Sequence, residues 1–319
     1  MTQPPAAASA DAELRKGTLY GVAAYAIWGT FPLYFHALKP SGPWEILAHR
    51  IVWTLVFCGL ILTIRRRDWG WMRTTLRNPR LLGGLTVAAL VIAVNWVVYI
   101  LAVVSGRTYE AALGYFLNPI VTVGLGVLVL GERLRRLQWA AVGVGALAAI
   151  YLTVAGGVVP WIPVVLAASF ATYGLVKKRV GASLAAMQSL AAETIVLAPV
   201  AVGILAWLEV ASTPTLGRHG GVHTGLLLSA GIVTAIPLLF FAAAARRVPL
   251  VTIGLLQFMT PVLQLLCGVL LLGEHVAPAL WVGFGIVWVA LALLTLDSLR
   301  SARAGRAQVA RTDLEDPEP

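Results

Sequence analysis

Cysteine and charge are both scarce in this sequence. Only 2 of its 319 residues are cysteines, and Cys58 and Cys267 lie far apart in apolar stretches, so neither a disulfide framework nor a cysteine metal site is indicated. Charged residues make up 12% of the chain, whereas an ordinary soluble domain has about 25%. The motifs G-x-S-x-G and H-E-x-x-H and the P-loop are also missing. We therefore expect no catalytic residue, no metal site and no cofactor.

Apolar residues are abundant instead. They make up 59% of the chain, and the mean hydropathy is +0.84. Apolar runs of about 20 residues are long enough to cross the ~30 Å hydrocarbon layer of a bilayer as helices. The sequence predicts an all-α integral membrane protein with ten transmembrane helices, at 17–38, 43–64, 81–104, 110–131, 135–156, 160–176, 183–208, 223–244, 249–272 and 277–298.

The net charge of +10 has a topological explanation. If the N-terminus is cytoplasmic, nearly all Lys and Arg residues fall in cytoplasmic segments, and the opposite segments hold only Lys39, Arg107 and Arg218. This asymmetry predicts a multi-pass protein of the cytoplasmic membrane with both termini in the cytoplasm. Nucleic acid is therefore not expected as a partner, although basic proteins often bind it.

The chain also repeats itself. Residues 95–132 align without a gap on residues 237–274, so that Pro119 meets Pro261. Each unit holds five predicted spans, and because five is odd, the second unit must be inverted relative to the first, as in many secondary transporters. The predicted organisation is a cytoplasmic tail (1–16), two inverted five-helix repeats (17–156 and 157–298) and a disordered cytoplasmic tail (299–319).

Several stretches carry a family likeness: LYGVAAYAIWGTFPLYF, EILAHRIVW, NWVVYILAV, EAALGYFLNP, VLGERLRRLQW and RRVPLVTIGLLQF. Together they resemble the RarD branch of the EamA family, in the drug/metabolite transporter superfamily, over residues 17–298. The resemblance implies a ten-helix inverted-repeat fold and secondary transport of small molecules, and the RarD name is linked with chloramphenicol sensitivity. It does not imply one substrate, because members of the superfamily differ widely in cargo.

The expected function is secondary transport of a small molecule, such as a metabolite or chloramphenicol, by alternating access. Coupling to protons is left open, with Glu193 and His49 as the titratable groups. A flippase for a lipid-linked cargo is the alternative within transport. A membrane-embedded enzyme or sensor is the alternative outside it, and the missing hydrolase motifs and soluble signalling domain argue against both.

Ionisable residues inside the spans are the first site candidates, because an ionised side chain at the bilayer centre costs about 2.5–3.5 kcal/mol. The shift between the repeats carries Arg50 to Ala192, next to Glu193. We expect Arg50 and Glu193 to pair, either as a packing contact or as a pair that breaks during transport. Glu45 starts its helix and is interpreted mainly as a solvated carboxylate favoured by the helix dipole. His49 lies one turn further on.

Four other polar residues inside or at the ends of spans are considered next. Two have both a functional and a structural interpretation, and two have a structural one only. Asn95 and Tyr99 are four residues apart and share a helix face, so they either bind cargo or join helices by hydrogen bonds. Glu132 and Glu274 each follow a glycine at the end of a span. That pattern predicts that each caps the helix that begins after it.

Two prolines lie at matching positions of the two repeats, inside the fourth and ninth predicted spans. Pro119 and Pro261 each remove one backbone hydrogen bond, which frees the carbonyls of Tyr115 and Gln257. Freed carbonyls are tolerated within a membrane where they line a cavity or find other donors. With Asn118 beside the first proline, these groups predict either one wall of a binding site or a kink that only shapes packing.

Overall fold

The computed structural model describes residues 5–64, 69–131, 133–156, 160–180, 184–211, 213–248 and 250–315. Within these ranges every regular element is a helix. The first half of the chain forms α1 (Pro5–Ala37), α2 (Pro43–Ile64), α3 (Gly70–Arg77), α4 (Pro79–Val104), α5 (Thr108–Leu130) and α6 (Arg136–Gly156). The second half forms α7 (Trp161–Val180), α8 (Ala186–Val210), α9 (Gly220–Ala245), α10 (Leu250–Leu256), α11 (Met259–Leu266), the π-helical turn η1 (Cys267–Leu271) and α12 (Pro278–Glu315).

Seven helices in the described ranges are long and apolar enough to cross a membrane: α2, α4, α5, α6, α8, α9 and the Pro278–Asp297 part of α12. Two shorter apolar stretches are Trp161–Lys177 and Met259–Leu271. Helices of this length and composition satisfy their own backbone polar groups, as the hydrocarbon layer requires. The chain is a multi-pass membrane protein.

The helix bounds depart most from the sequence prediction at four places. The ninth predicted span, 249–272, is divided into α10, α11 and η1. The break between α10 and α11 falls at Gln257 and Phe258, where Pro261 leaves the Gln257 carbonyl without its regular helical donor. The short helix α3 was not predicted. Helix α1 begins earlier than its predicted span, and α12 continues further than its predicted span, each into a segment predicted as a tail.

The early start of α1 has local support. The segment is rich in alanine, which favours helix, and the Glu13 carboxylate accepts a hydrogen bond from Nε of Arg247 at 2.8 Å. This contact, with a second from Lys16, lowers the pKa of Glu13 below its ordinary value. An extended α1 therefore reaches the connection between α9 and α10.

The packing between helices follows one pattern in both halves. Helix α1 packs on α9 and α11, and α7 packs on α4 and α5 in the same way. Helix α2 contacts α9, α8 contacts α4, and α2 and α8 also contact each other. Each of these contacts is recovered when α1, α2, α4 and α5 are exchanged for α7, α8, α9 and α11, the helices that follow in the same order.

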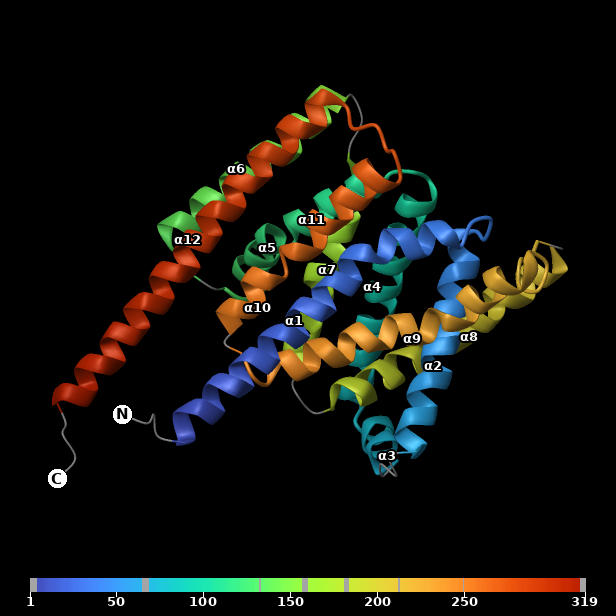
Figure 1. Ribbon diagram of the computed structural model, residues 1–319, viewed down its shortest axis with the longest axis horizontal. Coiled ribbons are helices and arrows are strands. Elements are labelled where there is room, and N and C mark those ends of the chain that lie inside the picture. The colour runs from blue at the N-terminus through green and yellow to red at the C-terminus, as the bar shows by residue number, and fades with distance from the viewer. Residues whose placement is uncertain are drawn as a thin grey trace.

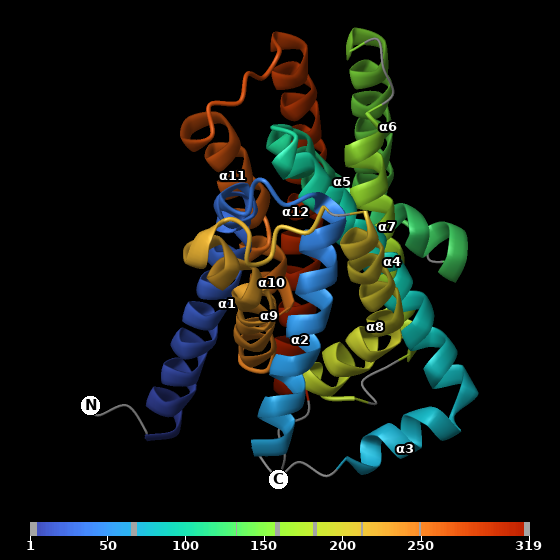
Figure 2. The same cartoon turned by 90° about the vertical axis from the view of Figure 1, so that its right-hand side faces the viewer.

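Figure 1 shows α6 and α12 side by side along one edge of the molecule, consistent with their direct packing. Figures 1 and 2 place the start of α1, the end of α12 and α3 toward the same end of the bundle. The largest hydrophobic cluster lies among α1, α2, α4 and α7 and includes Phe35, Ile51 and Ile100. Helix α2 contributes Ile46, Leu47, Ala48 and Ile51 to this cluster, and Arg50 lies within the same buried stretch.

Candidate functional site

Arg50 is buried at the contact between α2 and α9. Its side chain is 5% exposed, and its Nε donates a hydrogen bond to Oγ1 of Thr234 at 3.0 Å. The two helices approach closely at Gly231, where an added Cβ would lie 2.0 Å from the carbonyl oxygen of Trp53. Only glycine allows this approach, and Thr234 follows Gly231 by one helical turn. The close contact therefore brings the Thr234 hydroxyl to Arg50.

Aromatic rings surround the Arg50 guanidinium. Its central carbon lies 4.0 Å from the ring centroid of Trp96, and 5.7 Å and 5.8 Å from those of Phe35 and Phe31. A cation over an aromatic face is attracted by the ring quadrupole, and more strongly where water is excluded. The tyrosines within electrostatic reach of the guanidinium are Tyr34, Tyr99 and Tyr115. We call Arg50, Thr234 and these six aromatic residues the Arg50 centre.

The predicted pair between Arg50 and Glu193 is not formed. Among the described residues, no carboxylate lies within ion-pair distance of Arg50, and its two terminal nitrogens donate no hydrogen bond. Ala192, the position that the repeat shift matches to Arg50, packs on Leu81 and Leu85 of α4. Glu193 hydrogen-bonds to Tyr173 and Lys177 of α7, and the prediction of the pair was wrong.

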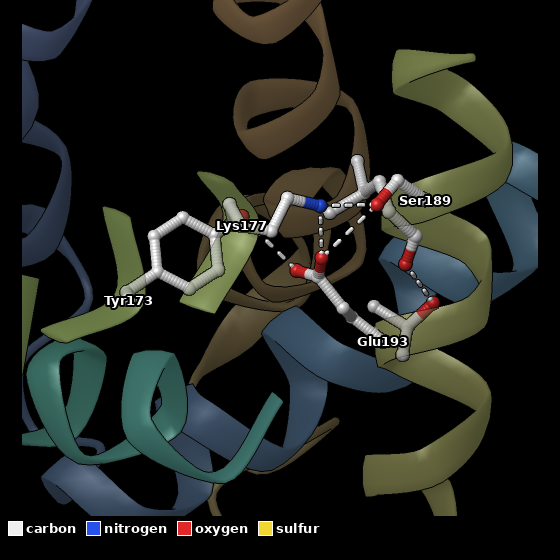
Figure 3. Close-up of polar contacts among 6 residues, drawn as sticks. Tyr173, Lys177, Ser189 and Glu193 are labelled. Atoms are coloured by element: carbon white, nitrogen blue, oxygen red, sulfur yellow. Dashed lines mark hydrogen bonds and ion pairs between the residues drawn. The ribbon is translucent and has the colours of Figure 1, made fainter. Parts of the chain in front are cut away.

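Glu193 belongs to a second polar group, the Lys177 cluster, made of Tyr173, Lys177, Ser189 and Glu193. Lys177 Nζ lies 2.7 Å from Oε1 of Glu193, and the same oxygen accepts from the Ser189 hydroxyl at 3.2 Å. Tyr173 donates to Oε2 at 3.2 Å, and Lys177 also donates to Ser189. Figure 3 shows the lysine nitrogen beside both Ser189 and the carboxylate. The glutamate charge is thus neutralised and nearly enclosed by hydrogen bonds.

Sequence reasoning missed Lys177 because it counted this residue only among the cytoplasmic positive charges. A usable signal was present. Tyr173 and Lys177 are four residues apart on α7, and Ser189 and Glu193 are four apart on α8, so each pair shares one helix face. Two such faces of complementary charge on consecutive helices indicate a contact.

Asn95 joins α4 to α7. Its Nδ2 donates to the Leu166 carbonyl and to the Ser169 hydroxyl, each at 3.0 Å, and its Oδ1 accepts from Tyr115 at 3.1 Å. In this conformation its side chain connects helices, the second of its two predicted roles. Tyr99 is 2% exposed, packs on Phe35 and Tyr115, and has a buried hydroxyl with no hydrogen-bond partner.

The two prolines have different effects. Helix α5 continues through Pro119, and Oδ1 of the neighbouring Asn118 is buried without a partner. Before Pro261 the helix is interrupted, and the carbonyl of Gln257 accepts a hydrogen bond from the Thr260 N–H at 3.3 Å. The Gln257 side chain is exposed. Of the groups predicted to line a binding site, the Gln257 carbonyl thus has a hydrogen-bond partner nearby in the chain. Tyr115 and Asn118 lie in the middle of α5, away from its two ends.

Glu45 is not the solvated carboxylate that was predicted. It is 2% exposed, and its Oε1 accepts a hydrogen bond from the backbone N–H of Thr215 at 2.6 Å. The connection between α8 and α9 covers the start of α2 and removes water from this carboxylate. His49, also buried, accepts a hydrogen bond at Nδ1 from the Trp53 indole at 3.3 Å. These two residues therefore have partners within the fold.

Glu274 caps a helix other than the predicted one. Its two carboxylate oxygens accept hydrogen bonds from the backbone N–H groups of Thr108 at 2.9 Å and Tyr109 at 3.1 Å. These groups start α5, whose first N–H groups have no partner within the helix. The prediction of a cap was right in kind and wrong in target, because η1 ends against α5. Glu132 lies outside the described residues.

The described helices form a membrane bundle with buried charges at its helix contacts. A family model described as the EamA-like transporter family matches the chain twice, over residues 15–154 and 159–296. The chain belongs to this family, which confirms the resemblance seen in the sequence.

Individual relatives agree. The chain is 53% identical to the protein RarD of Streptomyces exfoliatus, covering 94% of both chains. It is 38% identical to the protein RarD of Escherichia coli, covering 91% of this chain and 97% of that protein. It is 32% identical to the chloramphenicol-sensitive protein RarD of Pseudomonas aeruginosa, covering 90% and 96%.

A solved crystal structure of another protein, 20% identical, is similar with a TM-score of 0.57 and covers 88% of this chain and 97% of that chain. This likeness concerns the fold alone.

Proposed function

We propose that this protein is a secondary transporter that moves a small molecule across the cytoplasmic membrane by alternating access between two inverted five-helix repeats, 17–156 and 157–298. The two matches of the family model support two repeats. The packing of α1, α2, α4 and α5, which recurs for α7, α8, α9 and α11, supports a pseudo-two-fold relation between them. The positive-inside asymmetry supports cytoplasmic termini.

The observation that carries the proposal is the position of Arg50. It lies on α2 of the first repeat and donates to Thr234 on α9 of the second. Ionised side chains inside membrane proteins are costly and mark substrate or ion pathways, and transporters of inverted repeats bind substrate between the repeats. A movement of α9 against α2 changes the surroundings of this cation, as alternating access requires.

Proton coupling is proposed to act through the Lys177 cluster. Glu193 is its only carboxylate, and it accepts hydrogen bonds from Lys177, Ser189 and Tyr173. Protonation of Glu193 removes the charge that holds Lys177 on α7 against α8. The ion pair between these helices is then lost.

The first test is uptake by liposomes that contain the purified full-length protein. Candidate cargo comes from an unbiased comparison of metabolites and drugs in cells with and without the gene, with chloramphenicol included because of the name of one relative. We expect uptake of at least one small molecule, stimulated by a pH gradient and insensitive to ATP. Uptake of every candidate equal to that of empty liposomes would refute transport. Uptake that is indifferent to the gradient would refute coupling alone.

A further inference from the structure

We propose that the Arg50 centre binds an anionic group of the transported molecule, a carboxylate or a phosphate, and that the molecule has an aromatic or apolar body. The inference rests on the proposed transport function and names the substrate class of the same site. It follows from the charge, the free donors and the walls of the centre.

The charge of Arg50 has no counter-ion in the described chain. Arg50 is the only lysine or arginine among the buried residues of the described ranges. Other basic residues of the described chain do have carboxylate partners, as in Lys177–Glu193 at 2.7 Å and Arg107–Glu110 at 2.6 Å. A buried charge is costly unless it is paired and hydrogen-bonded. An anionic ligand supplies both the opposite charge and the hydrogen-bond acceptors that the protein leaves out.

Most donors of Arg50 remain available for such a ligand. Of the five N–H donors of a guanidinium, the one on Nε is taken by Thr234 at 3.0 Å, and the central carbon lies 4.0 Å from the Trp96 ring centroid. These two contacts restrict the position of the guanidinium. The terminal nitrogens have no acceptor among the described residues. A guanidinium presents such donors as a rigid fork that matches the two oxygens of a carboxylate or phosphate.

A second unpartnered group lies in the same centre. The Tyr99 hydroxyl is buried and has no hydrogen-bond partner, whereas Tyr34 donates to the Leu226 carbonyl at 2.7 Å and Tyr115 donates to Asn95 at 3.1 Å. A buried hydroxyl is costly without a hydrogen-bond partner. Tyr99 therefore offers a second donor, on a ring that packs on Phe35, which itself faces the guanidinium.

The walls of the centre define the rest of the molecule. Phe31, Phe35 and Trp96 face the guanidinium, and the Tyr99 ring packs on Phe35 and Tyr115. Aromatic walls favour an apolar or aromatic body, because its burial releases water from both surfaces. A neutral ligand of the same shape leaves the Arg50 donors unpaired, and sites built for a charged or hydrogen-bonding group reject such analogues strongly.

The test is equilibrium binding to the purified full-length protein in detergent, where no transport is needed. The probe is radiolabelled benzoate, and the competitors are phenyl phosphate, neutral benzamide and cationic benzylamine. We expect benzoate to bind, phenyl phosphate to compete, and benzamide and benzylamine to compete at least about tenfold more weakly. Arg50→Met should lower benzoate affinity at least about tenfold and remove the preference for anions. Arg50→Lys keeps the charge but lacks the forked donors, so its benzoate affinity should lie between those of the parent and Arg50→Met.

Arg80→Met is the matched control, since it makes the same change at an exposed arginine of α4, and should bind benzoate as the parent does. The proposal is overturned if the parent does not bind benzoate, if benzamide competes as well as phenyl phosphate, or if folded Arg50→Met and Arg50→Lys retain full affinity. Binding that depends on Arg50 without uptake by liposomes refutes the transport function alone. Uptake with no dependence on Arg50 or anionic charge refutes this inference alone.

Discussion

Arg50 and Glu193 occupy nearly equivalent positions in the two halves, on α2 and α8, yet the fold treats their charges in opposite ways. Glu193 has a basic partner, two hydroxyl donors and 3% exposure. Arg50 has one hydroxyl acceptor, aromatic neighbours and no carboxylate partner among the described residues. The difference separates a charge that the protein satisfies by itself from one that awaits an external partner. Four sets of variants test this distinction.

Arg50→Met should have the largest effect, and on transport rather than on stability. We expect uptake to fall at least about tenfold, because charge-assisted hydrogen bonds contribute about 1.5–3 kcal/mol. The melting temperature should stay the same or rise, because an apolar chain replaces an unpaired buried charge. Uptake by liposomes and tryptophan fluorescence on heating measure the two. If Arg50→Met unfolds instead, Arg50 is needed for the stability of the fold.

Lys177→Met, unlike Arg50→Met, should clearly lower stability. It leaves Glu193 buried without its counter-ion, and breaking a buried pair costs about 3–5 kcal/mol, toward the lower end here because the Lys177 side chain is 29% exposed. The double variant Lys177→Met/Glu193→Gln removes both charges and should regain most of the loss. Thermal unfolding of the single and double variants gives the coupling energy. Additive losses would show that the two charges do not depend on each other.

Gly231→Ala should separate α9 from α2. The new Cβ would lie 2.0 Å from the Trp53 carbonyl oxygen. The helices must therefore move apart, at a cost in stability of about 1–3 kcal/mol, and Thr234 moves with α9. Gly225→Ala on the same helix is the control, because nothing lies within 4 Å of its Cβ position. We expect a lower melting temperature and lower uptake for Gly231→Ala only. Equal behaviour of the two variants would contradict the close approach.

Glu274→Gln should have the smallest effect, about 1 kcal/mol, the usual contribution of a capping interaction. It removes the negative charge at the start of α5 and keeps one acceptor oxygen. Glu209→Gln, at an exposed carboxylate of α8, is the control and should leave the melting temperature unchanged. A shift as large as that of Lys177→Met would mean that Glu274 does more than cap α5.

The sequence predicted much of the architecture. Length and hydropathy located α2 at 43–64, the bounds that the structure has, because an apolar run between a proline and an arginine cluster leaves little freedom. Arg50 and Glu193 were found as candidates because charge is rare in such a chain. Their partners were not predicted, since the repeat shift fixes the position of a residue along a helix but not the side on which it faces. Arg50 faces α9 and Glu193 faces α7, so the two side chains do not meet.

Glu45 and Glu274 show the same limit. Each stands at a helix end, where the sequence suggests a local role, yet each hydrogen-bonds backbone N–H groups far away in the chain. Such contacts depend on which loops cover which helix ends. Nothing in the neighbouring residues specifies this.

The cap that Glu274 places on α5 has a consequence for biosynthesis. The start of α5 leaves the ribosome long before residue 274 is made, so its first N–H groups must wait for the second half of the chain. The first copy of the repeat therefore cannot reach its final form while it is still alone in the membrane. Completion of α5 is a late step, and it links the maturation of the first half to the arrival of the second.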